Sequence, residues 1–356
     1  MNLHFFKRAI CLFIISITCC RITLADNYAI LISAGQATSD VVITNTEYWF
    51  DLYLTYEYLL LEEQYDSSKV FVFYGDGNDY NSLNPRYKKE LHNWGNITDY
   101  NNSKTTLNSV ITSLDSVITE EDNLLFFWLV GHGQKNDSTS DDSYVVWIEN
   151  YNEEILKNQL VALINSITHY NRRKIFWMTC HSGAMGGGYY NVNDSKTTLV
   201  TSSTSNELSY SEYFNSEPHA TFDYALFSLS TGVDPHGSLC PLVHYLPTTA
   251  IEDSLLSVNE LHSGISTFIS LNTNMLSYPQ HPCIFDMGDI ANKIFIGENK
   301  QMKNSSMSTN SSYWLDRLIL SDVEIESDID ISIDVDVQSE IRRNTFVPIG
   351  TTMVIK

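Results

Sequence analysis

The sequence predicts an α/β fold with a mainly parallel sheet flanked by helices, followed by a small C-terminal β module. Apolar runs of strand length recur along most of the chain, and stretches with helical apolar spacing separate them. Such alternation builds parallel sheets that are covered by helices on both faces. Over 323–337 apolar and acidic residues instead alternate, which is typical of a strand with one buried face.

The individual elements follow from these apolar patterns. Uninterrupted apolar runs predict buried strands over 28–33, 69–75, 123–130, 173–179 and 197–203. Apolar residues that recur every three or four positions predict helices over 48–64, 105–118 and 153–170. A short apolar run predicts an extra strand or hairpin arm over 143–149.

The two ends of the chain differ from the α/β domain, which we assign to 26–297. Residues 1–25 combine basic residues, a short apolar run and a small-residue cleavage site, so a signal peptide and a secreted or periplasmic protein are expected. Residues 298–312 are rich in Asn, Ser and Lys and predict a linker, and 313–356 form the acidic β module. No later segment is long and apolar enough to predict a membrane span.

The charge of the chain limits the classes of molecule that it can bind. The net charge is -22, because Asp and Glu number 43 against 21 Lys and Arg. Such a surface repels the phosphate backbone, so we expect a peptide or protein partner and no nucleic acid.

Two similar stretches place reactive side chains at the ends of predicted strands. "NLLFFWLVGHGQ" leads to His132, and "RKIFWMTCHSGAMGGG" leads to Cys180. If these strands are adjacent and parallel, their carboxyl ends lie at one edge of the sheet, where open α/β sheets bind ligands. The sequence therefore predicts that His132 and Cys180 share a cleft.

This pair of side chains is suited to nucleophilic attack by sulfur. A thiol with a pKa of about 8.5 is mostly protonated near neutral pH, and an imidazole next to it can accept the proton. The glycines on either side of His132 allow tight turns and close approach of the backbone. We expect the N–H groups of Gly133 and Cys180 to form an oxyanion hole.

Cysteine usage leaves two interpretations open. Once the signal peptide is removed, Cys180, Cys240 and Cys283 remain. One hypothesis pairs Cys240 with Cys283 in a disulfide and leaves Cys180 free. The other treats all three cysteines as small buried hydrophobic residues.

The motifs "VGHG" and "MTCHSGAM" resemble those of caspase-like cysteine peptidases, and within that group they look most like the legumain family. This family includes asparaginyl endopeptidases and the catalytic subunit of GPI transamidase. The resemblance implies a caspase-like fold, with Cys180 as the nucleophile, His132 as the general base and Gly133 as an oxyanion donor. It implies no metal or organic cofactor.

The run 45–51 resembles a third motif of the family. Asn45 and Asp51 hold the family's places, and Asn45 is expected to orient the ring of His132. Glu47 and Tyr48 stand where the family has an arginine and a histidine that help to shape the S1 pocket.

Three further positions are expected to bind substrate. His181 stands where the family has a glutamate, Ser209 falls at a serine wall of the S1 pocket, and Asp223 falls near an acidic pocket residue. The loss of the family's arginine, together with Glu47 and Asp223, predicts an acidic S1 pocket that favours Lys or Arg at P1. A preference for Asn or Asp remains the alternative.

Other classes of function stay open at this point. The same site could pass the acyl group to an amine, as a transpeptidase or transamidase does. The chain could also be a caspase-like binding domain without catalysis. A metal site built from His132, Cys180 and His181 lacks the fourth ligand that structural zinc usually has.

Overall fold

The computed structural model describes most of the α/β domain and several short strands beyond it. The described residues are 27–37, 47–63, 65–80, 94–118, 124–214, 217–238, 245–247, 256–271, 279–288, 291, 301–303, 306–307, 317–321, 324–325, 330–333, 338–341 and 352–355. The predicted signal peptide 1–25, Asn45 and Cys240 lie outside them.

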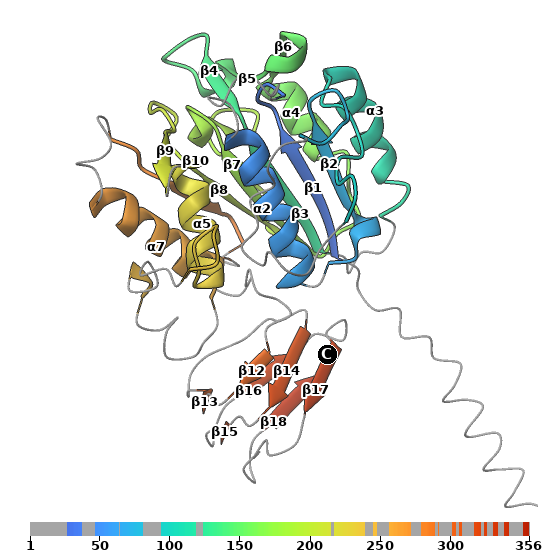
Figure 1. The fold of residues 1–356 in the computed structure, drawn as a ribbon, viewed down its shortest axis with the longest axis vertical. Coiled ribbons are helices and arrows are strands. Elements are labelled where there is room, and N and C mark those ends of the chain that lie inside the picture. Colours follow the sequence, from blue (N-terminus) through green and yellow to red (C-terminus); the bar gives the residue numbers. More distant parts are fainter. Residues whose placement is uncertain are drawn as a thin grey trace, which may run out of the picture.

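A six-stranded sheet forms the centre of the domain (Figure 1). Its order is β11-β8-β7-β3-β1-β2, and all neighbours are parallel except β11, which is antiparallel to β8. The strands are β1 (Asn27–Ser33), β2 (Val70–Tyr74), β3 (Leu124–Val130), β7 (Arg172–Met178), β8 (Thr197–Thr201) and β11 (Cys283–Asp286). The predicted fold class, a mainly parallel sheet flanked by helices, is confirmed.

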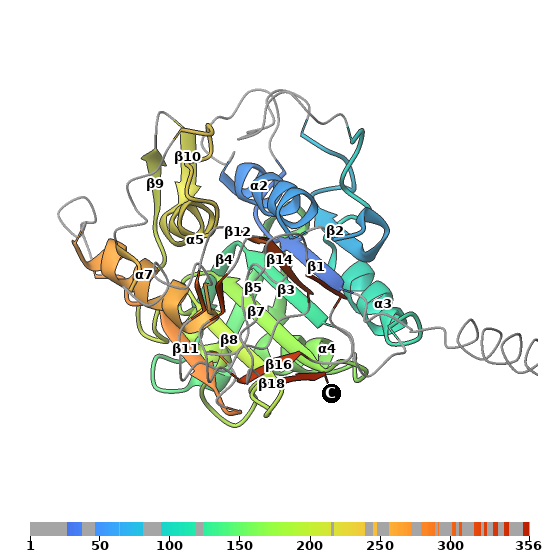
Figure 2. The same cartoon turned by 90° about the horizontal axis from the view of Figure 1, so that it is seen from below.

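Helices cover both faces of this sheet (Figure 2). On one face lie α2 (Glu47–Leu61), α5 (Thr221–Thr231) and α7 (Val258–Leu271), and on the other lie α3 (Lys104–Leu114) and α4 (Lys157–Ile164). Each face has its own apolar core. Trp128 and Phe176 pack toward α2 and α5, whereas their neighbours Phe127 and Trp177 pack toward α3 and α4, as expected from the alternation of side chains along a strand.

A three-stranded antiparallel sheet stands beside the carboxyl ends of the central strands (Figure 1). It consists of β4 (His132–Lys135), β5 (Tyr144–Ile148) and β6 (Glu153–Leu156). The extra strand predicted over 143–149 is therefore present, but the helix predicted over 153–170 is wrong at both ends. Residues 153–156 pair with β5 instead, α4 begins only at Lys157, and it ends at Ile164.

One of the two interpretations of the cysteines involves Cys240, which lies outside the described residues. Cys283 is a free thiol at the start of β11, where it lies 3.7 Å from the carbonyl oxygen of His281. An antiparallel edge strand fixes this position, since Cys283 pairs in register with Thr201 of β8.

Beyond residue 300 the structure describes short strands. They are β12 (Gln301–Lys303), β13 (Ser306–Met307), β14 (Arg317–Ser321), β15 (Glu324–Ile325), β16 (Asp330–Ile333), β17 (Gln338–Ile341) and β18 (Thr352–Ile355). All their pairings are parallel, including β14 with both β12 and β17. Two of them, β12 and β13, fall within the predicted linker. The alternating run 323–337 contains β15 and β16 rather than one described strand.

Candidate active site

The ends of β3 and β7 bring His132 and Cys180 to one edge of the sheet. The two strands are adjacent and parallel, with Val130 opposite Met178. The N–H of Gly131 donates to the carbonyl oxygen of Met178 at 3.1 Å, which extends the pairing one residue past β3. His132 follows Gly131, and Cys180 lies two residues beyond Met178.

Two glycines shape the turn that carries His132. Gly131 has a φ of 156°, and a Cβ there would lie 2.7 Å from the Cβ of Ala34. A Cβ on Gly133 would collide with the carbonyl oxygen of Cys180 and would lie 2.8 Å from Thr179 Oγ1. At Gly133 the backbone of β4 therefore lies so close to Thr179 and Cys180 that only glycine fits there.

The ring of His132 is held through one nitrogen. Its Nε2 lies 2.8 Å from the hydroxyl oxygen of Tyr48 and 3.3 Å from Oε1 of Glu149. Tyr48 belongs to α2, and its ring also meets the imidazole edge to face, with centroids 5.6 Å apart. About half of the His132 side chain (49%) is exposed, so the ring remains accessible to a substrate.

The thiol of Cys180 is partly buried and contacts the backbone of Ser209. The N–H of Ser209 lies 3.4 Å from Sγ, and the carbonyl oxygen of Ser209 lies 3.6 Å from it. Burial raises the pKa of the Cys180 thiol, and the N–H of Ser209 opposes this rise because it favours the thiolate. Ser209, predicted to form a wall of the pocket, therefore lies next to the Cys180 thiol.

His181 adopts an unusual backbone conformation. Its φ is 61°, in the left-handed region that residues with a Cβ rarely occupy. Its N–H donates to the carbonyl oxygen of Glu207 at 2.7 Å, and its Nδ1 lies 3.1 Å from the carbonyl oxygen of Ser205. These contacts direct the ring toward the segment 203–209 and turn the chain sharply after Cys180.

Glu47 begins α2, directly before Tyr48. Its Oε1 accepts a hydrogen bond from Ser211 Oγ at 3.3 Å. Burial, followed by the charge of Asp51, raises the pKa of Glu47 to about 7. This side chain is only partly buried and can face a ligand at this edge of the sheet.

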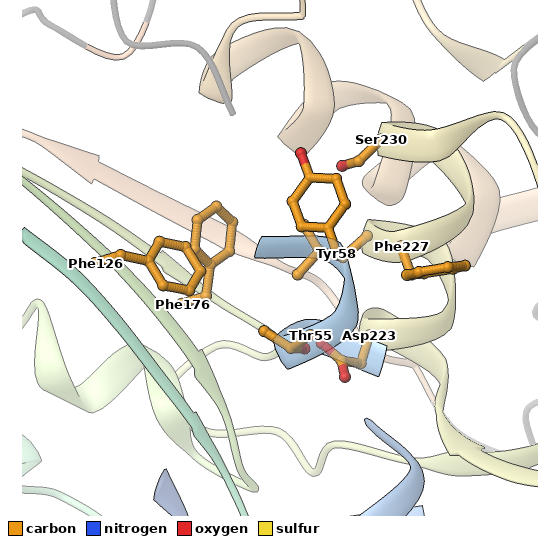
Figure 3. Close-up of a pocket in the computed structure, with 8 residues that line it drawn as sticks. Thr55, Tyr58, Phe126, Phe176, Asp223, Phe227 and Ser230 are labelled. Carbon is orange, nitrogen blue, oxygen red and sulfur yellow. The ribbon is translucent and has the colours of Figure 1, made fainter. Parts of the chain in front are cut away.

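Asp223 lies inside the domain rather than on an open surface. It is 4% exposed and accepts a hydrogen bond from Trp128 Nε1 at 3.1 Å. It also lines a small, mostly apolar cavity of about 20 Å³, where Figure 3 shows it beside Thr55. Such a volume holds about one water molecule, which is too little for a substrate side chain.

A buried ion pair accompanies Asp223. Asp51 Oδ1 lies 2.6 Å from Nδ1 of His219, and Oδ2 accepts the N–H of Ala220 at 2.9 Å. Burial lowers the pKa of His219, but the hydrogen bond that Asp51 accepts from the ring and the nearby charge of Glu217 outweigh it and raise this pKa to about 9. Burial raises the pKa of Asp223 well above its usual range, and the charge of Asp51 adds to the rise.

The structure thus gathers part of the predicted site. His132, Gly133, Cys180 and Ser209 meet at the sheet edge, and Glu47 lies next to Tyr48. His181 contacts the adjoining segment, whereas Asp223 is buried in the core. Sequence reasoning missed the contacts of Tyr48 and Glu149 with His132. Glu149 directly follows the apolar run 144–148, so it lies just past the end of a strand, as His132 and Cys180 do.

Within the described residues, no group of three or more His, Cys, Asp or Glu side chains could hold a metal ion. In the same part of the chain, no helix has the length and apolar character needed to cross a membrane.

Comparison with known proteins gives no family assignment. No protein-family model matches the chain, and no curated protein matches it. Among solved structures, caspase-1 from Spodoptera frugiperda is similar at 12% identity and a TM-score of 0.41, over 74% of this chain and 87% of that chain. A structure described as pro-sf-caspase-1 is similar at 11% identity and a TM-score of 0.41, over 75% and 94%.

Proposed function

We propose that this chain is a caspase-like cysteine endopeptidase of the legumain type, secreted through its N-terminal signal peptide. The observation that carries the proposal is the convergence of His132 and Cys180 at the ends of two adjacent parallel strands. The contacts of Tyr48 and Glu149 with His132 Nε2 add support, since they fix the orientation of the ring.

The chemistry follows from the positions of the groups. His132 takes the proton of the Cys180 thiol, and Sγ attacks the carbonyl carbon of the substrate. The resulting oxyanion is bound by the backbone N–H groups of Gly133 and Cys180. His132 then gives its proton to the leaving amine, which produces a thioester. Water attacks the thioester, which releases the acid and restores the thiol.

The P1 preference depends on Glu47. Of the two acidic residues assigned to the S1 pocket, Asp223 is buried in the core, whereas Glu47 is partly exposed near the end of β3. An ionised Glu47 favours a Lys or Arg side chain at P1, and a protonated Glu47 favours a neutral one such as Asn. We propose basic specificity above neutral pH, with Asn or Asp as the alternative.

The test is hydrolysis of a P1-varied fluorogenic peptide library by the mature protein, with Cys180→Ala in parallel. The matched control is Cys283→Ala, which removes the other described free thiol. We expect Cys180→Ala alone to abolish cleavage. Peptide products joined to an added amine would instead identify a transpeptidase or transamidase. Silence from wild type and control alike would favour a binding domain without catalysis.

A further inference from the structure

We propose that Glu149 is a positioning residue for His132, so that the site acts as a Cys180–His132–Glu149 triad. This inference rests on the proposed function and assigns a role to a carboxylate that none of the sequence motifs include.

The position of Glu149 is fixed by contacts with the end of β1. Its N–H donates to the carbonyl oxygen of Ala34 at 3.1 Å, and its Oε2 accepts the N–H of Gln36 at 2.8 Å. The other carboxylate oxygen, Oε1, faces His132 Nε2 at 3.3 Å. One oxygen therefore anchors the carboxylate to the chain that follows the central strand, and the second is aimed at the imidazole.

The carboxylate determines which ring nitrogen carries the proton. An ionised carboxylate only accepts hydrogen bonds, so Glu149 favours the tautomer with a proton on Nε2. The Tyr48 hydroxyl at the same nitrogen can accept as well as donate, and it is compatible with this tautomer. His132 Nδ1 has no partner among the described residues. Its lone pair is therefore available to take the proton of Cys180.

The charge of Glu149 also stabilises the imidazolium once the proton has moved. The ionisable groups that face this pair are Glu47 and Tyr48 from α2 and Cys180 from the end of β7. Burial raises the pKa of Tyr48 above its ordinary value, so its phenol stays neutral near pH 7. Glu47 and Glu149 are therefore the groups in this set that place negative charge near the ring. Of these two carboxylates, Glu149 is the one that contacts Nε2 directly.

The experiment measures the rate of Cys180 alkylation by iodoacetamide from pH 5.5 to 10, with peptide mapping to resolve each thiol. Wild type is compared with Glu149→Gln, Glu154→Gln and His132→Ala. Glu154 lies on β6 of the same small sheet, and its replacement removes the same charge without touching His132. The intact folding of each variant is checked by its thermal unfolding.

We expect wild type and Glu154→Gln to share a reactive plateau below the ordinary thiol pKa, because imidazolium stabilises the thiolate. Glu149→Gln should lower the rate on this plateau about tenfold, in the range of a lost charge-assisted hydrogen bond, while its rate at pH 10 stays within about twofold. An unchanged plateau in Glu149→Gln would overturn the triad. A wild type without any plateau, like His132→Ala, would overturn the proposed dyad itself.

Discussion

Oxygen atoms from two distant parts of the chain meet one nitrogen of His132. Tyr48 comes from α2 and Glu149 from the end of β5, and neither is near His132 in sequence. The same corner holds Glu47, whose carboxyl is partly removed from water. The fold therefore brings residues that are far apart in sequence into contact around His132.

Replacement of Glu47 by glutamine tests its environment. The folded-state pKa of about 7 exceeds the ordinary value of 4.5, so between these pH values the folded protein binds a proton that the unfolded chain has released. Stability is therefore lost as the pH rises from about 4.5 to about 7, and the loss persists above that range. We expect Glu47→Gln to melt at a higher temperature than wild type at pH 8 and at nearly the same temperature at pH 4.

Thermal unfolding at both pH values, with Glu154→Gln as control, measures this difference. A glutamine variant that is less stable than wild type at pH 8 would show that the Glu47 carboxylate is favourably paired.

The central strands owe their positions to uninterrupted burial. Every residue of β3 and β7 is buried, including Arg173 of β7. Arg173 donates to Thr197 Oγ1, to the carbonyl oxygens of Ile164 and Val192, and to Asp194. One buried side chain thus joins β7, β8 and the end of α4.

Arg173→Met should destabilise the domain strongly. The replacement leaves the carbonyl oxygens of Ile164 and Val192 without this donor, at a cost of about 1–3 kcal/mol each. It also removes the ion pair with Asp194, whose side chain is 40% exposed and keeps the Tyr170 hydroxyl as a donor. Lys196→Met is the control, since Lys196 is exposed and its loss should cost less than about 1 kcal/mol. Urea unfolding measures the free energy of unfolding of both variants and of wild type. Equal stabilities would show that the buried guanidinium contributes nothing net.

The elements that were predicted and those that were missed differ in their physical cause. Apolar runs identified β1, β3 and β7 because a strand buried on both faces must be apolar throughout. Strands β4 and β6 are short and partly polar, so only their pairing with β5 defines them. The helical spacing over 153–170 misled because Ile155 faces the core from a strand rather than from α4.

The candidate site divides in the same way. His132 and Cys180 were found because each lies two residues past the end of a recognisable strand. The burial of Asp223 depends on α5, an element that the sequence patterns did not identify, so its removal from the pocket could not be foreseen. The contact of Glu149 with His132 depends on how β5 packs beside β1, which no local pattern encodes.

The net charge of the molecule and its buried ionisable groups both make the stability of the folded protein depend on pH. The net charge of -22 produces repulsion that grows as the remaining acids and histidines lose protons. His219, with a folded-state pKa of about 9 against an ordinary value of 6.5, contributes stability below about pH 6.5 that is lost as the pH rises through 9. The raised pKa of Glu47 likewise lowers the stability of the folded protein as the pH rises from about 4.5 to 7.

We therefore expect the melting temperature to be higher at pH 5.5 than at pH 9. Sodium chloride at high concentration should reduce the difference without abolishing it, because salt screens surface charges but not the buried His219 pair. Thermal unfolding at both pH values in low and high salt measures this. A protein that is more stable at pH 9 would show that His219 is not protonated in the folded state.

The central claim, that Cys180 is an activated nucleophile, is tested most directly by covalent labelling with a peptide that carries an electrophilic ketone at P1. Peptide mapping by mass spectrometry then compares Cys180 with Cys283, the other described free thiol. The account predicts stoichiometric modification of Cys180, no modification of Cys283, and loss of labelling in His132→Ala. Equal modification of both cysteines, or an unlabelled Cys180, would contradict it.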